Sequence, residues 1–144
     1  MYLFDSQAFS DFVSGDTSKA AWGFFSKEEK SGRDVLVSRI SIGLLSAEIE
    51  NLQAMDRINW RKRLSNARRL FEVNRLVREV TSHVVDEWAE IRNMELQDSN
   101  GAPLGDSETL VIATAIAHQL SLVTSSPNIY APVVQNSGLL VTGI

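Results

Sequence analysis

Residues 108–124 have the sequence ETLVIATAIAHQLSLVT, in which two elements of different type follow each other directly. From Glu108 to His118 the stretch is rich in Leu, Val, Ile and Ala, which is typical of a helix that packs against a sheet. Residues 120–124 (LSLVT) have the composition of a short buried strand. A helix that leads into a buried strand is a repeating unit of α/β proteins.

The rest of the chain continues this alternation of strands and helices. Apolar runs that stop at polar residues predict strands at 2–4, 35–37, 76–80, 120–124 and 139–141. Apolar residues at helical spacing predict helices at about 6–13, 17–30, 41–49, 55–74, 81–91 and 108–118. The breaker-rich residues 98–103 and the segment around Pro127 are expected to be loops. The alternation predicts a three-layer α/β/α fold with a mainly parallel central sheet and helices on both faces.

The composition is that of one globular domain, which we expect to span residues 1–144. With 44% hydrophobic and 22% charged residues, the chain has neither the high charge nor the low content of apolar residues that is typical of a disordered protein. No apolar run approaches the roughly 18 residues of a membrane-spanning helix, and Asp5 interrupts the amino terminus before a signal sequence could form. These features predict a cytoplasmic protein without a membrane partner.

The sequence also limits the kinds of metal site. It contains no cysteine and only two histidines, His83 and His118. Disulfides, thiol catalysis and cysteine-ligated zinc are therefore excluded, and two histidines are too few for a histidine-rich metal cage. Any metal site must consist mainly of carboxylates.

The charge is distributed unevenly along the chain. The net charge is −4, yet residues 56–79 hold eight basic and three acidic residues, which gives this segment +5 and leaves −9 for the rest. A basic helical segment of this kind attracts phosphates through a weak, salt-sensitive interaction. The alternative is that it forms only a solvated helix face, as charge runs usually do. The candidate phosphate-binding residues are Arg61, Lys62, Arg63, Arg68 and Arg69.

Asp5 directly follows the first predicted strand. Ligands of parallel α/β sheets bind beyond the carboxyl ends of the strands, so this position favours a functional site. Asp5 could instead cap the helix that begins at Ser6, and Asp106 is similarly placed to cap the helix that contains Glu108. The sequence leaves both interpretations open.

The chain resembles PIN-domain proteins, most closely the VapC-type toxins of bacterial toxin–antitoxin modules. The resemblance covers nearly the whole chain and is most specific from Ala113 to Thr124. It implies an endoribonuclease that depends on Mg²⁺ or Mn²⁺, cleaves structured RNA, forms a homodimer and is neutralised by an antitoxin protein. The residues that carry the resemblance are 3–6 (LFDS), 37–49, the helix with Trp88, 103–115 (PLGDSETLVIATA), His118 and 122–124 (LVT).

The family pattern has three acidic positions and a fourth that is Asp or Asn, and only the first is identical here. Asp5 matches the first position, whereas the second falls on Leu44, the third on Glu108 and the fourth on Ser126. The resemblance thus implies that Asp5, Glu108 and Asp106 act as catalytic and metal-binding residues, with Ser6, Glu48 and Ser126 in support. Glu48 lies about 6 Å along the helix from Leu44, so it could act only through a water or a shifted helix.

Three hypotheses for the function follow. The first is the metal-dependent endoribonuclease toxin, in which Arg61, Lys62, Arg63, Arg68 and Arg69 bind the RNA. The second is a catalytically inactive PIN-like module that binds RNA or a partner protein, and the third is a structural dimerisation module. The expected homodimer would use apolar faces around Trp22 and Phe25 and around Trp88.

Overall fold

The computed structural model describes residues 1–98 and 100–144. Ser99, within the predicted loop 98–103, lies outside the described residues. The described part contains one sheet of five parallel strands in the order β3-β2-β1-β4-β5. The strands are β1 (Tyr2–Phe4), β2 (Val35–Ser38), β3 (Val77–Arg78), β4 (Ser121–Thr124) and β5 (Leu140–Gly143).

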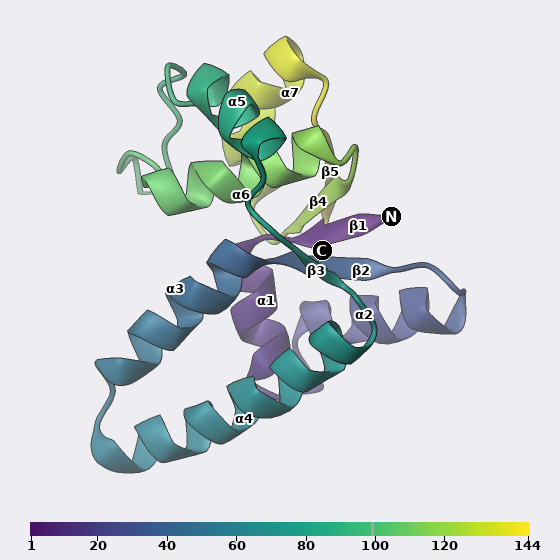
Figure 1. Ribbon diagram of the computed structural model, residues 1–144, viewed down its shortest axis with the longest axis vertical. Helices are drawn as coiled ribbons and strands as arrows, with labels where there is room; N and C mark the ends of the chain where they lie inside the picture. The colour runs from purple at the N-terminus through teal and green to yellow at the C-terminus, as the bar shows by residue number, and fades with distance from the viewer. Residues whose placement is uncertain (99) are drawn as a thin grey trace.

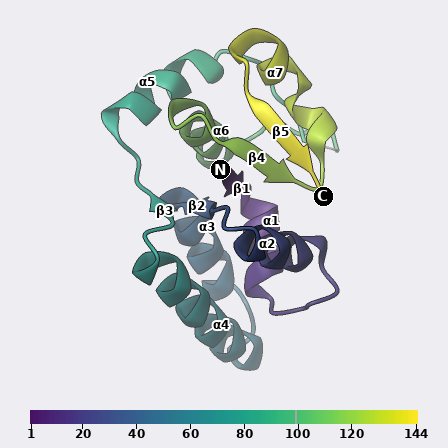
Figure 2. The same ribbon diagram turned by 90° about the vertical axis from the view of Figure 1, so that its right-hand side faces the viewer.

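Helices cover both faces of the sheet, as Figures 1 and 2 show. Helices α1 (Ser6–Val13), α2 (Ala20–Lys30), α3 (Arg39–Glu50) and α4 (Ala54–Val73) lie on one face. Helices α5 (Ser82–Ile91), α6 (Asp106–Ala117) and α7 (Ala131–Ser137), with the 3-10 helix η1 (Pro127–Tyr130), lie on the other. Within the described residues, none of these helices combines the length and the hydropathy needed to cross a bilayer.

The alternation of side chains along the central strands explains why both faces are covered. Leu3 of β1 and Leu122 of β4 belong to the cluster under α5, α6 and α7. Their neighbours Phe4 and Val123 point to the opposite face and join the phenylalanine-rich cluster under α1–α4. All four side chains are fully buried, because both faces of a central parallel strand are covered by helices.

The sheet has a topological switch point between β1 and β4. From β1 the chain builds β2 and β3 on one side and later adds β4 and β5 on the other. Connections that leave in opposite directions open a crevice beyond the carboxyl ends of the two strands. Asp5 follows β1 and residues 125–126 follow β4, so both segments border this crevice.

The structure confirms the predicted three-layer fold and corrects three local details. The second helix begins at Ala20 rather than near Thr17, because Asp16 accepts hydrogen bonds from the backbone and side chain of Ser18 and forms a turn. Strand β3 has only two residues. The segment after Pro127 is helical instead of a loop, and α7 ends where Gly138 adopts a left-handed conformation with φ of 71°.

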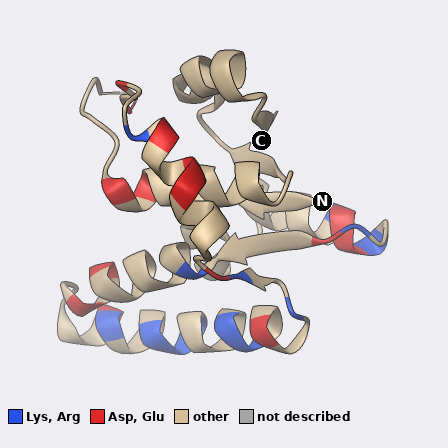
Figure 3. Ribbon diagram, turned by 45° about the horizontal axis from the view of Figure 1, so that its top comes forward, with Lys and Arg blue, Asp and Glu red and all other residues tan. Residues whose placement is uncertain are grey.

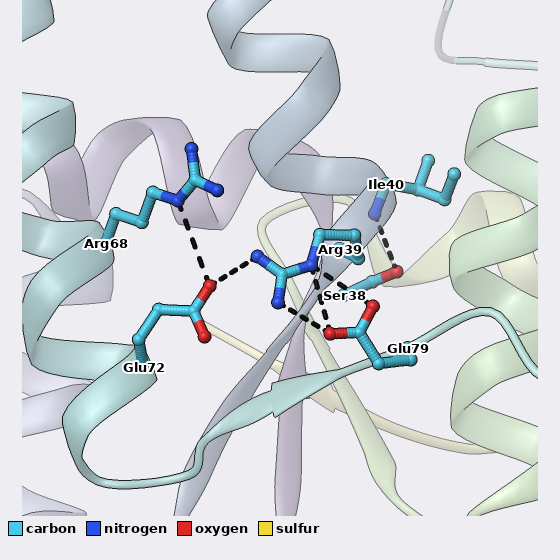
Figure 4. A network of polar contacts seen from close by, with 6 residues as sticks. All are labelled: Ser38, Arg39, Ile40, Arg68, Glu72 and Glu79. Atoms are coloured by element: carbon cyan, nitrogen blue, oxygen red, sulfur yellow. Dashed lines mark hydrogen bonds and ion pairs between the residues drawn. The ribbon is translucent and has the colours of Figure 1, made fainter.

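The short strand β3 is supported by side-chain ion pairs (Figure 4). Arg39, the first residue of α3, donates to Glu79 just after β3 at 2.6 Å and also pairs with Glu72 of α4. Arg68 lies 3.8 Å from the Glu72 carboxylate. Hydrogen bonds from Arg39 hold the pKa values of both glutamates below their usual range. Two of the three acids in the basic segment 56–79 are therefore paired with a residue outside it.

Candidate functional site

A cavity of about 200 Å³ lies at the switch point, beyond the carboxyl ends of β1 and β4. Its wall is formed by the first turn of α1, the start of α6, the segment 124–130 and part of the α5–α6 connection. No Lys or Arg is among the described residues that line it. The polar side chains in its wall include Asp5, Ser6, Asp98, Glu108, Thr124, Ser126 and Tyr130.

Asp5 is held from two sides at the base of this cavity. Its side chain is only 8% exposed. The Oδ1 atom accepts a hydrogen bond from the backbone N–H of Ala8 at 2.8 Å, and Oδ2 accepts one from the Tyr130 hydroxyl at 3.2 Å. The predicted helix cap is confirmed, and the same side chain also lines the cavity.

The environment of Asp5 disfavours its negative charge. Burial raises the pKa of the Asp5 carboxyl, and the hydrogen bonds that it receives only partly offset this effect. Burial and the neighbouring Asp5 charge also raise the pKa of Tyr130, so the phenol stays a neutral hydrogen-bond donor. A carboxylate surrounded only by neutral donors would be stabilised by a cation in the cavity.

Glu108 provides a second carboxylate, from the first turn of α6. Burial raises the pKa of Glu108, and the negative charges of Asp98 and Asp5 raise it further. Asp98 comes from the α5–α6 connection, where its Oδ1 accepts hydrogen bonds from the backbone N–H groups of Asn100 and Ala102 at 2.8 and 3.0 Å. Asp98 is not among the predicted site residues, because the sequence of its segment carries only loop signals.

Four of the six predicted site residues line the cavity, namely Asp5, Ser6, Glu108 and Ser126. Asp106 is not among the described lining residues; its exposed carboxylate accepts a hydrogen bond from Arg92 at 3.3 Å. Residues that are two positions apart in a helix lie about 200° apart around its axis, so Asp106 and Glu108 point in different directions. Glu48 lines a separate groove beside Trp60.

The donor set fits a partly hydrated cation better than a fully protein-ligated one. Within residues 1–98 and 100–144, no group of three or more His, Asp or Glu side chains is arranged to hold a metal ion. The predicted convergence of Asp5, Asp106 and Glu108 does not occur. Mg²⁺ usually keeps several waters and binds through one or two carboxylates together with substrate phosphates. Asp5 and Glu108 satisfy that smaller requirement, with hydroxyl groups nearby.

The basic residues of α4 differ in whether their side chains are engaged by neighbouring residues. Lys and Arg recur along this helix (Figure 3). Arg61 is paired with Glu50 at 2.6 Å, and Arg63 lies over the ring of Trp60 at 5.6 Å. Lys62 and Arg69 are exposed and seven residues apart, so they lie on nearly the same side of the helix.

The aromatic residues predicted to form dimer faces are partly used inside the fold. Phe25 is buried and packs on Phe12 with ring centroids 4.6 Å apart. Trp22 remains 37% exposed. The indole N–H of Trp88 donates to Thr109 at 3.0 Å, which attaches α5 to α6. These positions offer less free apolar surface than the sequence suggested.

Solved structures with the same fold include members of the VapBC family of toxin–antitoxin systems. A chain of VapBC2 from Rickettsia felis, crystallised with a promoter DNA fragment, matches with a TM-score of 0.71 and 14% identity over 99% of this chain and 98% of that one. A chain of FitAcB from Neisseria gonorrhoeae matches with a TM-score of 0.69 and 16% identity, over 99% and 97% of the two chains. A chain of DNA-bound VapBC from Salmonella typhimurium matches with a TM-score of 0.68 and 17% identity, over 99% of this chain and 96% of that one.

These matches cover nearly the whole chain and confirm the PIN-like fold that the sequence predicted. At identities below a fifth, the likeness is one of fold. No protein-family model matches the sequence, and no curated protein matches it either.

Proposed function

We propose that this chain is the toxin of a toxin–antitoxin pair, an endoribonuclease that uses Mg²⁺ or Mn²⁺ to hydrolyse RNA phosphodiester bonds. The observation that carries this proposal is the position of Asp5 and Glu108 in one cavity at the switch point of the sheet. The shared fold with toxin–antitoxin structures supports it, because parallel α/β sheets bind ligands at this point.

In this proposal Asp5 and Glu108 hold the cation, and water and an RNA phosphate complete its coordination. The bound cation would supply an activated water and stabilise negative charge at phosphorus. The Ala8 N–H and the Tyr130 hydroxyl keep Asp5 in place. The hydroxyl groups of Ser6 and Ser126 line the same cavity and would donate to phosphate or ribose oxygens.

Cleavage of RNA by the purified protein tests the proposal. We expect hydrolysis with millimolar Mn²⁺ or Mg²⁺ and none with EDTA, because two carboxylates bind the cation weakly. Cleavage that persists in EDTA would contradict the metal-dependent mechanism. A protein that binds RNA without cleaving it under any of these conditions would establish the alternative, an inactive PIN-like binding module. Leu44 and Ser126, which stand at two of the four positions of the family pattern, favour that alternative.

We further propose that an antitoxin docks on the hairpin of α3 and α4. Several similar structures are of complexes with antitoxins. The hairpin exposes Met55 and Ile58, which are 70% and 60% exposed, and Leu45, Leu52 and Trp60 of the same hairpin line a groove of about 150 Å³. Exposed apolar side chains and grooves are typical of a protein-binding surface. The homodimer implied by the family resemblance stays a prediction.

Replacing Lys62 and Arg69 together by Ala should weaken RNA binding. In Figure 1 the hairpin of α3 and α4 extends past the carboxyl edge of the sheet, the edge at which Asp5 lies. If both residues contact phosphates of single-stranded RNA, the slope of log affinity against log salt should fall by roughly 1.4. The measurement is a salt-dependent RNA titration.

The matched control is the double replacement of Lys27 and Lys30 by Ala. These lysines lie in the last turn of α2, which leads to the amino end of β2, at the edge of the sheet opposite to Asp5. The control changes the net charge equally. Equal salt slopes for the two double variants would mean that α4 contributes only general attraction.

A further inference from the structure

The hydroxyl of Tyr130 contacts Asp5 on the side opposite to the helix cap. Tyr130 is the last residue of η1, in the segment that follows β4, and only 6% of its side chain is exposed. Its ring belongs to the cluster under α5–α7, so the hydroxyl has a fixed position. This segment also carries Ser126, at the position where the family pattern has Asp or Asn. The contact of this segment with Asp5 is made by the hydroxyl of Tyr130.

The two oxygens of the Asp5 carboxylate receive hydrogen bonds from different elements, and the nearby Thr124 hydroxyl also lowers the pKa of this carboxyl. Ala8 N–H donates to Oδ1 and the Tyr130 hydroxyl donates to Oδ2. Because the donors approach from different elements, rotation of the carboxylate about its Cβ–Cγ bond would break both bonds. Each carboxylate oxygen can accept a second interaction, so the pair fixes the group without using all its capacity.

We propose that Tyr130 is a positioning residue that orients the Asp5 carboxylate toward the cavity, ready to bind a divalent cation. The cation in this proposal rests on the proposed function, whereas the orientation rests on the hydrogen bonds that the Asp5 carboxylate receives. Hydrogen-bond partners behind metal-binding carboxylates commonly change metal affinity 10- to 100-fold. Tyr130 would act in this way through the Asp5 carboxylate.

The variant Tyr130→Phe tests the orientation without any metal. It removes one oxygen and keeps the ring in the core. With a freer carboxylate, the Ala8 amide should exchange its hydrogen roughly tenfold faster, as expected for a weakened hydrogen bond. The Phe9 amide donates to the backbone carbonyl of Asp5 at 2.9 Å and serves as an internal reference. Tyr2→Phe, at the only other tyrosine of the chain, is the matched control and should leave both rates unchanged.

Titration with Mn²⁺ tests the consequence for the cation. The Mn²⁺ concentration that gives half the maximal rise in melting temperature should increase roughly tenfold in Tyr130→Phe and stay unchanged in Tyr2→Phe. An unchanged Ala8 exchange rate, or an unchanged midpoint when the wild type responds to Mn²⁺, overturns the role of Tyr130. If the wild type does not respond to Mn²⁺ at all, the proposed metal-dependent function fails, while Ala8 exchange still decides the orientation.

Discussion

Asp5→Asn is expected to abolish RNA cleavage while raising the melting temperature of the metal-free protein at neutral pH. The amide keeps the shape of the side chain and can still accept the Ala8 hydrogen bond, but it removes a buried negative charge. Loss of the cation should lower the cleavage rate by about 10³-fold or more, since metal catalysis contributes several kcal/mol. The Mn²⁺-dependent rise in melting temperature should disappear as well.

The stabilising part of this prediction depends on pH. Because burial raises the pKa of Asp5 in the folded protein, the folded state binds the proton more tightly than the unfolded chain. The resulting stability is present below the unfolded pKa of about 3.9 and is lost as the pH rises through the raised folded pKa. Asp5→Asn lacks this loss, so its melting temperature should exceed that of the wild type by an amount that grows from pH 4 toward neutrality.

Thermal unfolding at several pH values, with EDTA, measures this difference. Asp34→Asn is a suitable control, because Asp34 is exposed and precedes β2 at the opposite edge of the sheet. It should unfold and cleave like the wild type. If Asp5→Asn cleaves RNA normally, the catalytic site lies elsewhere. If it is less stable than wild type at neutral pH, the helix cap outweighs the cost of the buried charge.

The elements that could be predicted from the sequence are those with a strong local signal. The stretch 108–124 forms α6 and β4 close to the predicted bounds, because its apolar composition is sufficient to bury both elements. Helix α7 was missed because it has seven residues, Pro132 in its first turn and no helical period long enough to detect. Strand β3 was predicted too long, since only two of its residues pair with β2.

The candidate site could be predicted only in part, because its geometry depends on contacts across the whole chain. Asp5 was identified from its place at a strand end. Tyr130 was not, since the hydrogen bond joins residues 125 positions apart and nothing local marks that tyrosine. Asp98 lies in the loop between α5 and α6, and a loop has no periodic sequence pattern from which its path could be predicted. The separation of Asp106 from Glu108 follows from helix geometry once both are placed in the first turn of α6.

Leu44→Glu is expected to strengthen cation binding by roughly 10²-fold, since each added carboxylate ligand changes affinity strongly. Leu44 is half-buried on α3 and stands at the second acidic position of the family pattern. Glu48, one turn further along the same face, already affects the pKa of Glu108, which indicates that this side of α3 faces the start of α6. A glutamate at position 44 lies about 6 Å nearer to the end of β2 and so closer to Asp5.

This substitution should have opposite effects with and without metal. In EDTA a third carboxylate near Asp5 and Glu108 adds repulsion and lowers the melting temperature, whereas Mn²⁺ relieves the repulsion and gives a larger rise than in the wild type. Leu44→Gln separates the charge from the loss of the apolar side chain, and it should lower stability without improving Mn²⁺ binding. Ser46→Glu places the same charge about 200° around α3 at an exposed position. If Ser46→Glu lowers the Mn²⁺ midpoint as much as Leu44→Glu, the gain comes from overall charge and position 44 does not face the metal.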